Sequence, residues 1–427
     1  MRRSGCLGGA VGRLALAALV PVVAFGMAPP PAVVVDESLS PSVAWSAAVN
    51  AVLEAHAWDD GFGPVFAAHN RSLFDRVPDA KLRDLLAAAR KHQPRAAAAL
   101  SAIASAISAH PRGNYVSAEY LAGWLWFHEL AHTELASPEE AHQRSCCGVL
   151  VAPSSNASGA RVSPGLGGGG WVSHARNMDQ TPHAVRNLTL QLTVKPNGTG
   201  PVIQAVDWYW VTSGFMTAVV PGVASVQENW RYGQVSSESV FAAAARGVTP
   251  QVLLFREAFE AAGAQAGGAK AGYESFIEAV AYTELAAPMY AIAAGPGADD
   301  GAIVTRDPAG PALPVATHGI ARLADAAIGA GAGWRALVQT NYDRWEPDPP
   351  SDPRRTAAER LLRSMAPEVG SSSVGAFAAV SAYPVFNEDT AYTAIMCPND
   401  ACAEAGLPNL AAFTRQVLLP PDALPLA

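Results

Sequence analysis

The chain has 427 residues, of which 50% are hydrophobic and 15% charged, so it is large and apolar enough to bury a substantial core. Its formal net charge is −8, its sequence pI is about 5.7, and no basic stripe runs along it, which argues against a nucleic-acid-binding protein. Below that pI the chain becomes net positive, so we expect peripheral contact with anionic lipid membranes in an acidic compartment.

Residues 1–28 have the pattern of a signal peptide. Arg2 and Arg3 precede an apolar run over 14–27 that is too short, and too interrupted by proline, for a transmembrane helix. A retained signal anchor is the alternative. Four glycosylation sequons fit passage through the secretory pathway; they begin at Asn70, Asn156, Asn187 and Asn197. The sequence therefore predicts a secreted glycoprotein, or one of a lysosome or acidic vacuole-like compartment.

The apolar spacing from 42 to 142 is helical. Residues 81–93 place leucines on one face as far as Pro94, and 95–110 continue with Leu100, Ile103 and Ile107 at helical spacing. Ala-rich amphipathic pairs of this kind usually pack against a core, and a lipid-facing role is the alternative. We predict core packing and a helical N-terminal segment over 29–146.

The pattern changes to strands at Cys147. Residues 147–152 predict a buried strand, 154–170 a Ser/Gly-rich turn, and 171–178 a returning strand. Further predicted strands cover 188–194, 202–210, 219–228, 301–306, 334–341 and 392–396, and predicted helices cover 237–245, 250–262, 273–284, 357–365 and 373–382. Strands, then a block of helices, then strands again favour a layered α+β fold.

Four short motifs follow one another along this part of the chain. They are Arg176-Asn177-Met178-Asp179, Thr305-Arg306-Asp307, the run from Gln339 to Trp345, and Arg354-Arg355-Thr356. Together they resemble the acid ceramidase and N-acylethanolamine acid amidase family of N-terminal-nucleophile hydrolases, over 147–402. The resemblance implies an αββα sandwich preceded by a helical segment. It also implies a precursor that cuts itself between Cys146 and Cys147 into chains 29–146 and 147–427, which stay associated.

The resemblance assigns Cys147 as the nucleophile, because a thiolate attacks amides well once a base and a cation activate it. The base would be the α-amine of Cys147 itself, and Arg176 would be the cation. Asp179 would orient both by hydrogen bonding. Three features depart from the family: Gly148-Val149 replaces Thr-Ser after the nucleophile, Cys146 leaves the cleavage register open by one residue, and the Gly-rich insert makes the separation of Cys147 and Arg176 longer.

Three further residues match the family's site. Asn341 would donate from its side-chain amide to the oxyanion, Glu228 would lie at the edge of the site, and Arg354 would support it. The residues alone leave other interpretations open: Arg176 and Asp179 as an ordinary ion pair, and Asn341 as a turn residue.

The family resemblance implies hydrolysis of a lipid amide without cofactor or metal. Ceramide, giving a sphingoid base and a fatty acid, is the first substrate, and an N-acylethanolamine is the alternative. Cys397 and Cys402 resemble a disulfide-bonded C-terminal loop of acid ceramidase.

One motif indicates different chemistry. His128-Glu129-Leu130-Ala131-His132 is the H-E-x-x-H pattern of zinc hydrolases, which places two imidazoles on one helical face. The glycine and third histidine of the longer zinc signature are missing, so a third ligand is not identified. A zinc hydrolase is therefore the alternative outside the family, followed by a lipid-binding protein with an inactive site.

Overall fold

A computed structural model describes residues 27–137, 145–153, 170–263, 268–329, 333–404 and 407–415. The predicted signal peptide and Ser/Gly-rich turn therefore lie almost wholly outside the described residues. The last two residues of the predicted signal peptide, Met27 and Ala28, pair with Arg415 and Thr414, which places them in the folded domain. Among the described residues, no helix is long and apolar enough to cross a bilayer.

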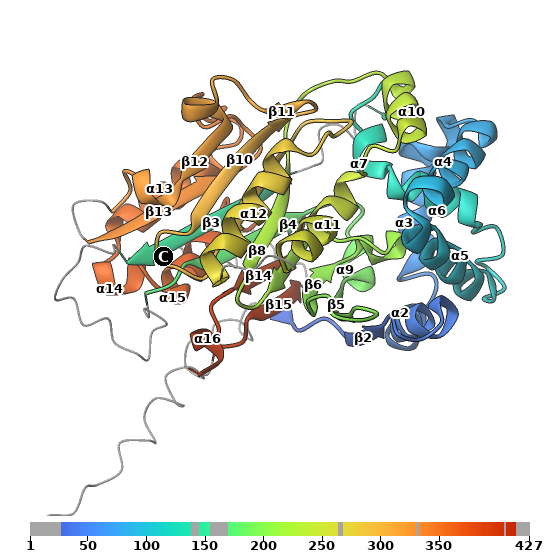
Figure 1. The fold of residues 1–427 in the computed structure, drawn as a ribbon, viewed down its shortest axis with the longest axis horizontal. Helices are drawn as coiled ribbons and strands as arrows, with labels where there is room; N and C mark the ends of the chain where they lie inside the picture. Colours follow the sequence, from blue (N-terminus) through green and yellow to red (C-terminus); the bar gives the residue numbers. More distant parts are fainter. Residues whose placement is uncertain are drawn as a thin grey trace, which may run out of the picture.

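The first of two sheets has six antiparallel strands (Figure 1). In spatial order they are β1 (Met27–Ala28), β15 (Leu410–Arg415), β14 (Thr390–Met396), β4 (Ser173–Asp179), β3 (Ser145–Pro153) and β13 (Trp334–Gln339). The hairpin of β3 and β4 confirms the two strands predicted at this point of the chain. Cys397 and Cys402 form the predicted disulfide just after β14.

The second sheet has nine strands. Its order is β11 (Gly310–Pro311), β10 (Gly301–Asp307), β9 (Met289–Ala294), β8 (Ala224–Trp230), β7 (Thr217–Val220), β6 (Ile203–Asp207), β5 (Leu190–Lys195) and β2 (Ala32–Asp36), with β12 (Ile320–Arg322) on β10. All pairs are antiparallel except β2 with β5. A turn at 221–223 divides the single strand predicted over 219–228 into β7 and β8.

The two sheets face each other across an apolar layer. Leu150 and Ala152 of β3 pack with Tyr290, Ile292 and Ala294 of β9. The alternate residues of β3, from Cys147 to Val151, pack instead with helices α13 (Arg354–Ser364) and α15 (Ser373–Ser381) on the outer face of the six-stranded sheet. Because side chains alternate along a strand, each face of β3 has its own core.

Helices cover the nine-stranded sheet from the other side, which completes the predicted layered α+β sandwich (Figure 1). They are α11 (Gln251–Gly263) and α12 (Gly268–Tyr282), whereas α10 (Ser237–Arg246) lies against the N-terminal helices. The N-terminal helices lie at one end of the molecule: α2 (Pro41–Ala55), α3 (Phe62–Ser72), α4 (Asp79–His92), α5 (Pro94–Ser108), α6 (Ala118–Leu125) and α7 (Phe127–Leu130). Shorter helices within the described residues are α9 (Val185–Leu188), α14 (Pro367–Gly370) and α16 (Ala401–Glu404).

The sequence predicted a helical N-terminal segment, but the structure also contains a strand there. Its strand β2 extends the nine-stranded sheet, and β1, which directly precedes the segment, extends the six-stranded sheet. Its helices bury apolar faces in the same core as the outer face of the nine-stranded sheet, including Trp45, Leu100 and Trp124. The predicted core packing of the Ala-rich helices is therefore confirmed.

Candidate active site

Cys146 lies near the start of β3, between β4 and β13 in the sheet, and is 4% exposed. It stands opposite Met178 of β4, and its Sγ lies 3.5 Å from Met178 Sδ. A guanidinium nitrogen of Arg176 donates to the same sulfur at 3.5 Å. Burial raises the pKa of the Cys146 thiol, and the positive charge of Arg176 opposes that rise. This cysteine therefore has the neighbouring cation that a nucleophilic thiol needs.

Arg176 is fully buried and is held from the second sheet. Its Nη1 donates to the Met216 carbonyl at 2.7 Å and to the Thr217 hydroxyl. Burial disfavours the charge, but Tyr392, Cys146, Asp207 and Glu228 outweigh it, so the pKa of Arg176 is raised and the side chain stays cationic.

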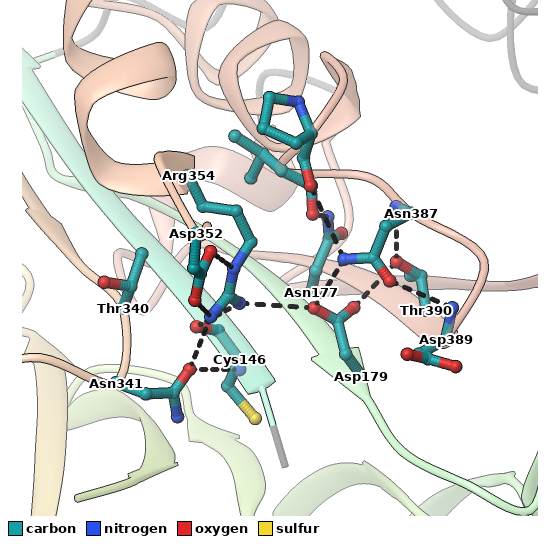
Figure 2. Close-up of polar contacts among 12 residues, drawn as sticks. Cys146, Asn177, Asp179, Thr340, Asn341, Asp352, Arg354, Asn387, Asp389 and Thr390 are labelled. Carbon is teal, nitrogen blue, oxygen red and sulfur yellow. Dashed lines mark hydrogen bonds and ion pairs between the residues drawn. The ribbon is translucent and has the colours of Figure 1, made fainter. Parts of the chain in front are cut away.

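Arg354 gathers the polar groups on the other side of Cys146 (Figure 2). Its guanidinium donates to the Cys146 carbonyl at 3.1 Å, to Asn341 Oδ1 at 2.9 Å, and to both carboxylate oxygens of Asp352 at 2.7 and 2.8 Å. It also lies 3.4 Å from Asp179. The side chain is only 4% exposed, so one buried cation ties the backbone of Cys146 to three side chains.

Asp179 ends β4 and is buried. Thr390 and Asn387 donate to its carboxylate at 2.7 and 3.0 Å. Burial raises its pKa, and Arg354 opposes that rise. The expectation that Asp179 orients Arg176 does not match this geometry: Asp179 meets Arg354, whereas Arg176 points between the sheets, because residues three apart on a strand face opposite sides.

Asn341 follows β13 and orients the main chain of Cys146. Its Oδ1 accepts from the Cys146 amide at 2.8 Å, and its Nδ2 donates to the Trp230 carbonyl at 2.8 Å. The sequence predicted that this amide donates to an oxyanion; in the structure its Nδ2 donates to the Trp230 carbonyl.

The structure contradicts the placement of Cys147 beside Arg176. Cys147 is fully buried on the opposite face of β3, among apolar residues of α13 and α15. Burial raises the pKa of its thiol to about 12. The physical reason is the two-residue period of a strand, by which a shift of one position moves a side chain to the other face. The register left open by the sequence therefore favours Cys146.

Glu228 is buried in β8 and faces the N-terminal helices, whereas its neighbours Gln227 and Asn229 face the six-stranded sheet. Gln227 accepts from buried His174 at 3.0 Å, and Asn229 donates to the Gln339 carbonyl at 3.0 Å. The amide of Glu228 donates to the Met216 carbonyl, which also accepts from Arg176. Glu228 thus lies close to the site, but its side chain is on the face of β8 that is directed away from the six-stranded sheet.

The H-E-x-x-H motif does not form a zinc site in the described part of the chain, where no group of three or more His, Cys, Asp or Glu side chains could hold a metal. Only Phe127–Leu130 is helical, and His132 lies in the following turn. Glu129 accepts from the Gln251 amide at 2.7 Å, and burial raises its pKa to about 8.

Sequence reasoning missed Asp352, Asn387 and Thr390 as members of this cluster. Asp352 could have been noticed because it stands two residues before Arg354. The other two reach Asp179 only because β14 pairs with β4, where Thr390 lies opposite Asp179.

Comparisons with known proteins agree with these motifs. No protein-family model matches the chain. It is 29% identical to the N-acylethanolamine-hydrolyzing acid amidase of Rattus norvegicus over 230 residues, which are 53% of this chain and 57% of that protein. It is 25% identical to the Caenorhabditis elegans protein of the same name over 254 residues, 58% of this chain and 61% of the relative.

A solved structure of the Caenorhabditis elegans ortholog is also similar, with a TM-score of 0.44 and 24% identity, and it covers 64% of this chain and 100% of the solved chain. The chain spans little more than half the length of the curated relatives that it matches. These sequence relatives support the resemblance of the chain to the acid ceramidase and N-acylethanolamine acid amidase family, and Arg176, Asn341 and Arg354 of the matching motifs contact Cys146.

Proposed function

We propose that this chain is a self-cleaving cysteine amidase that hydrolyses the amide bond of an N-acyl lipid, with Cys146 as its nucleophile. The observation that carries the proposal is the arrangement around one residue: Arg176 donates to its sulfur, Asn341 accepts from its amide and Arg354 donates to its carbonyl. The register then differs by one from that expected from the sequence, and the chains would be 29–145 and 146–427.

Self-cleavage would begin with attack of the Cys146 sulfur on the carbonyl carbon of Ser145. The Ser145–Cys146 amide bond breaks as the thioester forms, and the nitrogen of Cys146 takes up the thiol proton to become a free amine. Water then hydrolyses the thioester, which releases the carboxyl group of Ser145 and regenerates the thiol. Asn341 already accepts from the nitrogen concerned, so it would hold the new amine close to the sulfur.

Turnover would use the same groups on a substrate. The α-amine, with an ordinary pKa of about 7.7–8.0, takes the thiol proton, and the sulfur attacks the acyl carbonyl of the lipid amide. The amine of the head group leaves with that proton, and water releases the fatty acid from the acyl-thioester. Arg176 would stabilise the thiolate, while Arg354 and Asp179 would hold the main chain of the nucleophile.

The relatives favour a fatty-acid amide of the N-acylethanolamine type as substrate over ceramide, which the sequence motifs had put first, because the curated relatives carry that name. Ceramide stays as the second candidate. An acidic lysosome-like or secreted location, and binding to anionic membranes, remain predictions from composition and the N-terminal pattern.

The test is gel analysis with N-terminal sequencing of the purified chain after incubation at about pH 4.5, followed by assays with an N-acylethanolamine and with ceramide. We expect a fragment beginning at Cys146 in the parent, none in Cys146→Ala, and continued cleavage in Cys147→Ala. A fragment beginning at Cys147 would return the register to the sequence-based assignment. A chain that stays whole and releases no fatty acid from either substrate would refute the proposed function.

A further inference from the structure

The H-E-x-x-H segment contacts the end of β8 through both of its histidines. Nε2 of His128 lies 2.9 Å from Oε1 of Glu228, and both side chains are 3% exposed. The ring of His132 stacks on that of Trp230, with centroids 3.4 Å apart and an interplanar angle of 3°. Its Nδ1 donates to the Gly233 carbonyl at 2.9 Å.

The spacing of the motif matches the spacing of its targets. Glu228 and Trp230 are two residues apart, so they point to the same face of β8. His128 lies in α7 and His132 in the turn that follows, and both rings contact Trp230, with centroids 4.9 and 3.4 Å away. The pattern that indicates zinc from sequence is used here for side-chain contacts to a strand.

The end of β8 in turn holds groups that surround Cys146. The Trp230 carbonyl accepts from Asn341, whose Oδ1 accepts from the Cys146 amide. The Glu228 amide donates to the Met216 carbonyl at 2.9 Å, and the same carbonyl accepts from Arg176 at 2.7 Å. The position of β8 therefore affects both the main-chain and the sulfur side of Cys146.

We propose that the segment His128–His132 is a positioning element of the amidase site, in which His128 acts through Glu228 and His132 through Trp230. The inference rests on the proposed function. Because the segment precedes Cys146, the N-terminal chain would supply this support to the C-terminal chain after self-cleavage. The C-terminal chain alone would then lack part of its site's support.

The experiment compares rates of self-cleavage in full-length chains. His128→Leu keeps the bulk but removes the ring nitrogen that lies 2.9 Å from Glu228, so we expect cleavage to slow by roughly ten- to a hundredfold, as when one partner of a buried polar contact is removed. His128→Gln keeps a polar group at this position and should stay within about threefold of the parent, by the same reasoning. His110→Gln is the matched control, because His110 stacks on Trp58 within the N-terminal segment.

A double-mutant cycle separates this role from general stability. If His128 acts through Glu228, His128→Leu adds little to the effect of Glu228→Gln. A His128→Leu chain that cleaves itself as fast as the parent would overturn the inference. A double variant whose rate loss equals the product of the two single losses would also overturn it, because the two residues would then act independently.

A second measurement does not depend on self-cleavage: the pH profile of Cys146 alkylation by iodoacetamide, in a Cys147→Ser background. The negative charge of Glu228 raises the pKa of the Cys146 thiol, as does that of Asp179, whereas Arg176 lowers it. Glu228→Gln removes that negative charge, so the profile should move to lower pH in this variant. If His128 fixes the position of Glu228, the profile should also shift in His128→Leu but not in His128→Gln. An unchanged profile in His128→Leu would overturn the inference even if the parent never cleaves itself.

Discussion

Arg354 offers the sharpest test of how the site is held together. In Arg354→Met, Asp179 remains fully buried without its cation, and the acceptors on Asn341 and the Cys146 carbonyl lose a donor. Removing one partner of a buried ion pair costs about 3–5 kcal/mol of the free energy of unfolding. Thr390 and Asn387 still donate to Asp179, so we expect the lower end of that range.

The assay is urea-induced unfolding followed by tryptophan fluorescence, in a Cys146→Ala background that keeps the chain uncut. Arg363→Met is the control: Arg363 lies on the same helix, is 53% exposed and is 3.7 Å from Glu359, so its loss should cost less than about 1 kcal/mol. Asp179→Asn combined with Arg354→Met removes the uncompensated charge, and the double variant should be more stable than the sum of the two single effects by about 1 kcal/mol or more. An Arg354→Met chain as stable as Arg363→Met would refute this reasoning.

Three further predictions follow from the same geometry. A Cβ on Gly148 would lie 2.8 Å from the Gln227 amide, which His174 holds in place. Gly148→Ala should therefore lower the free energy of unfolding by about 1–3 kcal/mol and slow self-cleavage. A variant with the parental stability and cleavage rate would contradict this packing. Burial raises the pKa of Glu129 to about 8 from 4.5, so the folded chain keeps a proton that the unfolded chain releases, and this group makes stability fall as pH rises from 4.5 to 8. Glu129→Gln should therefore gain stability relative to the parent between about pH 5 and pH 8 in urea titrations, by at most about 1.4 kcal/mol per pH unit; a stability difference independent of pH would show that Glu129 does not titrate in this way. Treatment with EDTA should leave self-cleavage and amide hydrolysis unchanged, and a loss restored by zinc would return the H-E-x-x-H motif to a metal role.

Local pattern in the sequence was sufficient for most elements. The alternation over 188–194, the helical spacing of leucines over 81–93 and the Pro94 break depend on neighbours in the chain, and the corresponding β5, α4 and α5 are present. The strands β2, β9 and β15 were missed. Met289–Ala294 of β9 is buried on both faces, and a continuous apolar run of this kind does not distinguish a strand from a buried helix.

The residue types that meet at the site could be predicted from the sequence, because the motifs around Arg176, Asp179, Asn341 and Arg354 follow one another along the chain. Local sequence does not distinguish Cys146 from Cys147, whereas the fold directs these groups to Cys146, because adjacent residues on a strand face opposite sides. The same holds for the H-E-x-x-H motif. Its residue types permit zinc binding, but its partners are Glu228 and Trp230, which lie about a hundred residues further along and reach it only through the packing of β8 against the N-terminal helices.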